Sequence, residues 1–135
     1  MSATLNDRAK ALLRRPVFAS LATVAPDGSP QVTPVWIDVD GDDVIFNTAD
    51  GRAKAVNIRR NPEVGLSDFD PDDPYGSVVS LRGKVTEITT EGADAHIDAL
   101  AKKYMGVDEY PLRQPGEVRL KIRITPEKVA MQPGG

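Results

Sequence analysis

The sequence predicts a mainly β fold: a small antiparallel barrel, closed or split, with six or seven strands and two or three helices. Its 135 residues suit a single domain, residues 1–135, with one core. Short runs rich in β-branched and aromatic residues recur along the chain. Tight turns containing proline or glycine separate most of these runs, which favours antiparallel neighbours. Because the strand edges of such a barrel need covering, we expect a dimer.

The first half of the chain predicts a helix followed by strands. Residues 6–14 repeat leucine and alanine at helical spacing, and Pro16 ends this helix. Three strands are then predicted from β-branched runs separated by a Pro-Asp-Gly-Ser turn and an Asp-Gly turn, at residues 17–24, 31–39 and 43–48. Pro34 cannot donate to a β-ladder. The second strand is therefore an edge strand, or is bulged or open at that point.

The second half continues this pattern after a short basic helix. Residues 63–69 and 77–88 predict strands, and Gly83 within the second indicates a bulge or a close backbone approach. Residues 89–104 predict a helix that Thr89 or Thr90 caps and Met105-Gly106 ends. Its buried stripe is expected to be Ile97, Leu100, Ala101 and Tyr104. A polar loop follows, and then strands at residues 118–124 and 128–131, interrupted by Pro126.

Composition excludes several classes of function. The net charge of −3 argues against a nucleic-acid-binding protein, and no segment is apolar enough to span a bilayer. The N-terminal residues carry no secretion signal, so we expect a cytoplasmic protein. Without cysteine there are no disulfides or thiolate metal sites, and we predict no metal site. The single histidine, His96, is expected to be a surface or hydrogen-bonded residue. We identify no catalytic residue, and any chemistry is expected to depend on a bound cofactor.

Residues 50–62 carry the strongest functional signal. They predict a short helix that Asp50 caps and Asn61-Pro62 ends, directly after a strand. Its first turn carries Arg52 and Lys54. Free N–H groups, the positive end of the helix dipole and two cations together form an anion site. We interpret this turn as the site of a cofactor phosphate, and the alternative is a solvated basic face.

Five segments of the sequence resemble a known family. They are Phe18–Thr23, Asp27–Pro30, Thr33–Trp36, Phe46–Thr48 and Arg52–Val64. Together they resemble the pyridoxamine 5'-phosphate oxidase-like split-barrel family of flavin-binding proteins. More narrowly, they are similar to its small members that depend on the deazaflavin coenzyme F-420. The last segment, from the basic pair to Asn-Pro, is the most specific of the five.

The resemblance implies a homodimer with two cofactor sites at the subunit boundary. It implies that Arg52 and Lys54 hold the cofactor phosphate and that Asn57 supports the same end. The residues implied to lie against the ring are Thr33, Pro34, Val35, Asn47 and Thr48. The partner subunit is expected to contribute from the segment between Tyr75 and Ser80. Arg59 and Arg60 are candidates to reach the acidic tail of the coenzyme.

The function that this resemblance implies is an F-420-dependent oxidoreductase, which transfers hydride between the deazaflavin and a small organic substrate. Pyridoxamine phosphate oxidases proper use an arginine and a lysine in the second strand, whereas this chain has Gln31–Trp36 without either. Synthesis of pyridoxal phosphate is therefore not expected. Two alternatives remain: an FMN-dependent reductase or oxidase, and a non-catalytic F-420 or FMN carrier or sensor.

Trp36 is expected either to stack on a ring or substrate, or to pack in the core or an interface. Tyr75 and Tyr110 are proton-donor candidates or structural residues.

Overall fold

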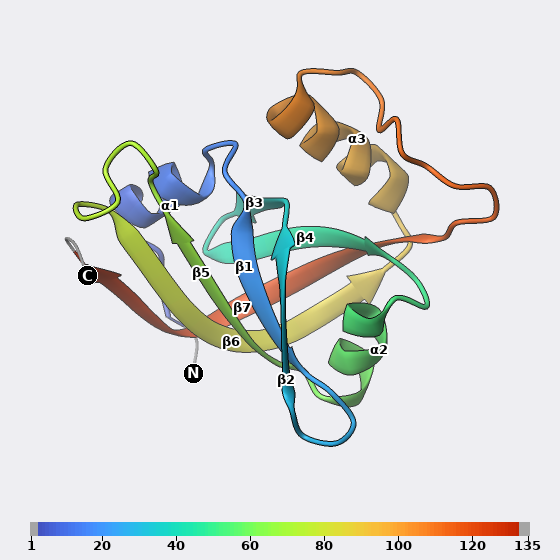
Figure 1. Ribbon diagram of the computed structural model, residues 1–135, viewed down its shortest axis with the longest axis horizontal. Helices are drawn as coiled ribbons and strands as arrows, with labels where there is room; N and C mark the ends of the chain where they lie inside the picture. Colours follow the sequence, from blue (N-terminus) through green and yellow to red (C-terminus); the bar gives the residue numbers. More distant parts are fainter. Residues whose placement is uncertain (1–2, 133–135) are drawn as a thin grey trace.

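The computed structural model describes residues 3–132, which form three helices and seven strands (Figure 1). In chain order these are α1 (Asp7–Leu13), β1 (Ala19–Val24), β2 (Pro30–Val35), β3 (Ile37–Asp40), β4 (Asp43–Ala49), α2 (Ala53–Arg60), β5 (Glu63–Phe69), β6 (Val78–Thr89), α3 (Ala93–Met105) and β7 (Arg119–Gln132). The predicted mainly β class is confirmed. No helix in this range is long and apolar enough to cross a membrane.

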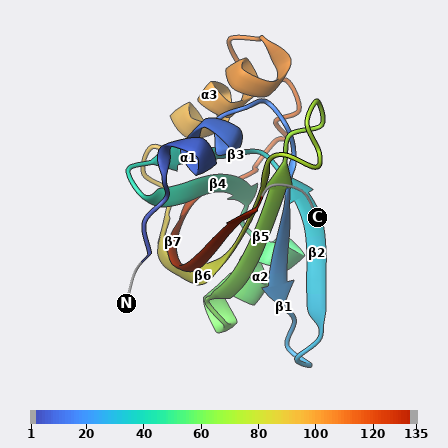
Figure 2. The same cartoon turned by 90° about the vertical axis from the view of Figure 1, so that its left-hand side faces the viewer.

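All seven strands form one antiparallel sheet with the order β2-β1-β5-β6-β7-β4-β3. The two edge strands, β2 and β3, are joined by Trp36 alone. The sheet must therefore curl until its two edges meet at this residue. Figure 2 shows the curl, with β1, β2 and β5 upright on one side and β3 and β4 crossing on the other. The fold is a curled half-barrel, and the dimer remains a prediction.

Apolar side chains fill the inside of the curl. The largest fully buried ones on the strands include Leu21, Phe46 and Ile122. α1 packs on this core through Leu12 and Leu13, and α2 through Ala55 and Ile58. With one side of α2 held in the core, the opposite side of its first turn is left to face outward. This orientation decides where the basic residues of that turn can reach.

Two predicted strand boundaries are wrong, and both errors involve pairing with distant strands. The single strand predicted at residues 31–39 is divided at Trp36, because β2 pairs with β1 whereas β3 pairs with β4. Pro34 does lie on an edge strand, which was one of the three predicted possibilities beside a bulged or an open strand. Conversely, Pro126 does not interrupt the last strand. It lies opposite Gly83 at a register shift between β6 and β7, where a missing backbone donor is tolerated.

The predicted ends of α2 and α3 at Asn61-Pro62 and Met105-Gly106 are confirmed, but their predicted N-terminal caps are wrong. α2 begins after Arg52, whose side chain makes no capping hydrogen bond, and Asp50 instead pairs with Arg59 at 3.5 Å. α3 begins after Gly92, while the Thr89 hydroxyl accepts from the Glu91 N–H in the preceding turn. Gly51 and Gly92 both have positive φ values, of 91° and 72°. These glycines reverse the chain after the expected caps and so move the helix starts forward.

Gly83 is expected to tolerate no side chain. A Cβ atom at this position would overlap the Thr125 carbonyl oxygen and lie 2.9 Å from Pro126 Cα, both of them backbone atoms of the paired strand. We expect Gly83→Ala to lower the free energy of unfolding by about 2 kcal/mol, measured by urea denaturation.

Gly65→Ala provides the matched control for this substitution. Gly65 lies on the adjacent strand β5, and the nearest atom to its added Cβ would be 3.8 Å away. It should leave stability unchanged or slightly raised. Equal losses in the two variants would show that the close approach at Gly83 does not limit stability.

Candidate functional site

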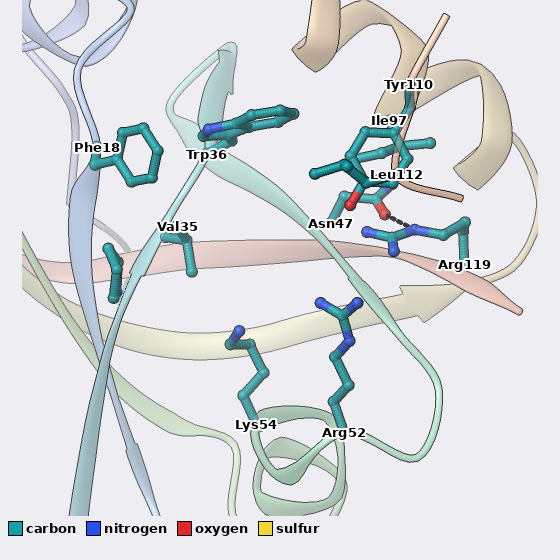
Figure 3. Close-up of a pocket in the computed structure, with 11 residues that line it drawn as sticks. Phe18, Val35, Trp36, Asn47, Arg52, Lys54, Ile97, Tyr110, Leu112 and Arg119 are labelled. Carbon is teal, nitrogen blue, oxygen red and sulfur yellow. Dashed lines mark hydrogen bonds between the residues drawn. The ribbon is translucent and has the colours of Figure 1, made fainter. Parts of the chain in front are cut away.

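A pocket of about 150 Å³ lies where the two edges of the sheet meet, between α2 and α3 (Figure 3). Its lining residues come from β2, the β2–β3 junction, β4, both helices, β7 and the loops before β1 and β7. They are Phe18, Pro34, Val35, Trp36, Asn47, Arg52, Lys54, Ile97, Tyr110, Leu112 and Arg119. One wall is cationic and the other is apolar and largely aromatic.

Three elements bring the cationic wall together. The end of β4 pairs with the start of β7, so that Ala49 lies opposite Arg119. α2 follows β4 after a short turn, which brings Arg52 and Lys54 to the same place. Figure 3 shows Lys54 and Arg52 extending from α2 toward the pocket and Arg119 entering from β7. The start of α2 supplies Arg52 and Lys54, and the pairing of β4 with β7, which are far apart in the sequence, adds Arg119 to them.

Two of the three cations share a single carboxylate, Glu117. Arg119, which is only 4% exposed, donates to Glu117 from Nη1 and to Asn47 Oδ1 from Nε at 2.9 Å. Arg52 lies 3.6 Å from the same carboxylate. Burial opposes ionisation of Glu117, but the Gln114 N–H and Arg119 hold its pKa below the ordinary value. Glu117 is thus ionised, and the wall keeps an excess of positive charge.

Lys54 is the cation with the least compensation. It is partly buried and forms no ion pair within residues 3–132. Burial, followed by the charges of Arg52 and Arg119, lowers the pKa of its ammonium group. An anion that enters the pocket removes this penalty, because it supplies the missing opposite charge. The three cations therefore form a site that favours a bound anionic group.

The apolar wall is built around Trp36. Its indole stacks on the Tyr104 ring with centroids 5.2 Å apart and planes 9° from parallel. The Tyr104 hydroxyl accepts from the Ile37 N–H and donates to the Val17 carbonyl, which fixes its ring beneath the indole. Phe18 and Tyr110 meet Trp36 edge to face. This aromatic wall is preformed, and it stands opposite Arg52 and Lys54 across the pocket (Figure 3), whereas Arg119 lies over the Tyr110 ring, 5.3 Å from its centroid.

Five of the residues predicted to bind the cofactor line this pocket: Pro34, Val35, Asn47, Arg52 and Lys54. Thr33 and Thr48 are their chain neighbours but do not line it. The Thr48 hydroxyl is buried without a partner among the described residues.

The other predicted residues lie elsewhere. Asn57 is 4% exposed and donates to Thr23 and Gln31, so it ties α2 to the β1–β2 hairpin. Arg60 donates to the Ala25 carbonyl. Tyr75 is 80% exposed on the loop before β6, and Ser80 lies on β6 away from the pocket. The contribution of these last two residues from a partner subunit remains a prediction.

Sequence reasoning missed Arg119, Phe18 and Ile97 as lining residues. For Arg119 a signal existed, since the alternation of residues 118–124 places it on the polar side of the last strand. Nothing local indicates that this side faces the start of α2. Within the described residues, no three histidine, aspartate or glutamate side chains are arranged to hold a metal ion.

Comparisons with known proteins agree with this geometry. The family model described as pyridoxamine 5'-phosphate oxidase matches residues 5–132. An F-420 reductase of known structure is 34% identical with a TM-score of 0.81, over 93% of this chain and 98% of its own. None of the curated proteins matches the sequence significantly.

More distant structures share the fold alone. A conserved hypothetical protein from Mycobacterium tuberculosis is 24% identical, with a TM-score of 0.78, over 98% of this chain and 86% of its own. General stress protein 26 from Bacillus anthracis is 16% identical, with a TM-score of 0.71, over 96% and 94%.

Proposed function

Because the chain belongs to the pyridoxamine 5'-phosphate oxidase family, we propose that it is a coenzyme F-420-dependent oxidoreductase, which transfers hydride between the deazaflavin and a small organic substrate. The observation that carries this proposal is the convergence of Arg52, Lys54 and Arg119 on a pocket with an aromatic wall. It is supported by the 34% identity to an F-420 reductase over nearly the full length of both chains.

The residues of the pocket fit such a coenzyme. A phosphate needs cations and N–H donors, and these are supplied by the three cationic side chains and by the uncapped start of α2. A flat ring needs a flat apolar surface, and Trp36 offers one that is already held in place by Tyr104. The donor set of this chain therefore matches both chemical parts of the ligand.

The size of the pocket supports a second subunit. Its volume of about 150 Å³ is smaller than the roughly 300–1,000 Å³ typical of small-molecule sites. One chain thus provides an aromatic surface and cations for a bound anion, but it does not enclose a ligand of this size. We propose a homodimer in which the partner closes this site, with the segment from Tyr75 to Ser80 as the candidate contribution.

Positioning is the main catalytic contribution of the chain itself. When bound, the coenzyme supplies a hydride from its ring carbon. Arg52, Lys54 and Arg119 fix the anionic end, and the stacked pair of Trp36 and Tyr104 sets the plane against which a ring can lie. Holding two reactants in register in this way replaces a collision between free molecules by a step within one complex. Among the residues that line the pocket, Tyr110 is the one with a hydroxyl group, and it is therefore the proton-donor candidate.

The cofactor can be identified by titration, because Trp36 is the only tryptophan and lines the pocket. Coenzyme F-420 and FMN are added separately to purified protein while tryptophan fluorescence is followed. We expect F-420 to quench Trp36 with a dissociation constant at least about 10-fold below that of FMN. Tighter binding of FMN would reassign the protein to the FMN-dependent alternative.

Turnover distinguishes an enzyme from a carrier. Reduced coenzyme on the protein is mixed with a panel of enones, quinones and tetrapyrroles, and its reoxidation is followed by absorbance. We expect at least one acceptor to be reduced faster than it is without protein. A failure of every acceptor, despite tight binding of the coenzyme, would favour the carrier or sensor.

A further inference from the structure

The orientation of the Asn47 side-chain amide is fixed by groups that permit only one arrangement. Its Oδ1 lies 2.9 Å from Arg119 Nε, which can only donate. Its Nδ2 lies 2.9 Å from the Ala93 carbonyl oxygen, which can only accept. The carbonyl end of the amide therefore faces Arg119, and the NH₂ end faces α3.

This orientation determines the protonation of His96. Asn47 Nδ2 also lies 3.1 Å from His96 Nδ1. Since Nδ2 is a donor, Nδ1 must be the acceptor, and the ring is neutral with its proton on Nε2. Burial, followed by the charge of Lys121, lowers the pKa of His96 to about 4. The neutral acceptor is thus present throughout the physiological range of pH.

We infer that His96 is a positioning residue for Arg119: it holds the Asn47 amide so that the guanidinium presents its unused N–H groups to the pocket. A guanidinium carries five N–H donors, and the described contacts of Arg119 use Nε for Asn47 and Nη1 for Glu117. The remaining donors lie at the pocket lining. That they meet the cofactor anion rests on the proposed function.

The surroundings of His96 distinguish this role from simple packing. Its Nε2 is buried and has no hydrogen-bond partner among the described residues. A buried N–H without an acceptor lowers stability. An apolar ring of similar shape would remove this unpaired N–H, but it would leave one N–H of Asn47 Nδ2 without its acceptor. The contribution of His96 lies in the acceptor at Nδ1, which a phenylalanine lacks.

The test uses two substitutions that differ in this acceptor. His96→Phe keeps a ring but removes it, whereas His96→Asn places a carbonyl oxygen close to the position of Nδ1. The first readout is the ¹⁵N–¹H signal of Arg119 Nε in protein without cofactor, assigned by its loss in Arg119→Lys. We expect protection of this signal from solvent exchange in the wild type and His96→Asn, and loss of protection in His96→Phe. Thermal unfolding checks that each variant is folded.

The second readout is the affinity for coenzyme F-420, followed by Trp36 fluorescence. We expect the dissociation constant to rise about 10-fold in His96→Phe and to stay within about 2-fold of the wild type in His96→Asn. A protected Arg119 signal in folded His96→Phe would overturn the inference. If His96→Phe does not fold, His96→Ala replaces it under the same expectations. A wild type that binds no F-420 would refute the proposed function, and the Arg119 signal alone would then decide the role of His96.

Discussion

Lys54→Ala is expected to weaken binding of coenzyme F-420 about 100-fold, equivalent to about 2.7 kcal/mol, while leaving the fold intact. Lys54 pays a desolvation penalty without an ion-pair partner within the described range, and its pKa is lowered as a result. The bound phosphate is therefore the partner that stabilises this charge. Because the substitution removes an uncompensated cation, thermal stability should be unchanged or slightly higher.

The expected effect is specific to Lys54 because of how charges are shared in the pocket. Arg52 is already 3.6 Å from Glu117, so part of its charge is neutralised before any ligand arrives. Arg52→Ala should accordingly cost less affinity than Lys54→Ala. Lys102→Ala provides the matched control, since Lys102 is an exposed lysine on α3 outside the pocket lining.

Titration of the three variants through Trp36 fluorescence checks this order. Unchanged affinity in Lys54→Ala would remove the phosphate role from this residue and with it the central support for the proposed function. Equal losses of affinity in Lys54→Ala and Lys102→Ala would indicate a general charge effect rather than a specific contact. Raising the salt concentration would then abolish the difference in affinity between the wild type and each variant.

The part of the site predicted from sequence is the part encoded locally. Arg52 and Lys54 follow a strand within a few residues and lie at the start of a helix, so the sequence alone predicts that they are close together. Arg119 joins them only because Ala49 pairs with it across β4 and β7. That register depends on contacts between segments about seventy residues apart, which no local pattern specifies.

The same distinction explains the errors in the fold. The alternation from residue 31 to residue 39 is continuous, but Val35 pairs with β1 and Ile37 with β4. Pro126 ends a strand by local rules, yet Gly83 on the paired strand provides the space that lets β7 continue. In both places the partner strand decides the outcome, and the partner cannot be read from the residues themselves.

Asp68 is expected to make the stability of the protein fall as pH rises from about 4 to about 7, by about 3 kcal/mol. This residue lies on β5, is 1% exposed, and accepts the Phe69 N–H at Oδ1. Its Oδ2 is buried without a partner among the described residues. Burial raises the pKa of Asp68 to about 7, although the Phe69 N–H, Lys103 and Arg15 act in the opposite direction.

The sign follows from proton binding in the two states. Between its unfolded and folded pKa values, Asp68 is protonated in the folded protein and ionised in the unfolded chain, so unfolding releases a proton. The stability that the protonated carboxyl provides is complete below pH 4 and is lost as pH passes through about 7. Above that range the folded protein contains a buried carboxylate, and the loss no longer grows.

Asp68→Asn isolates this contribution, because an asparagine keeps the acceptor for the Phe69 N–H and cannot ionise. Urea denaturation of both proteins at about pH 4 and about pH 8 should give similar stabilities at the lower pH and a variant more stable by about 3 kcal/mol at the higher. Asp108→Asn, at an exposed position in the loop before β7, should leave the pH dependence of the wild type unaltered. If the wild type and Asp68→Asn differ by the same amount at both pH values, Asp68 is not protonated in the folded protein near neutral pH. The carboxylate would then need a partner or a water molecule that stabilises its charge inside the curl of the sheet.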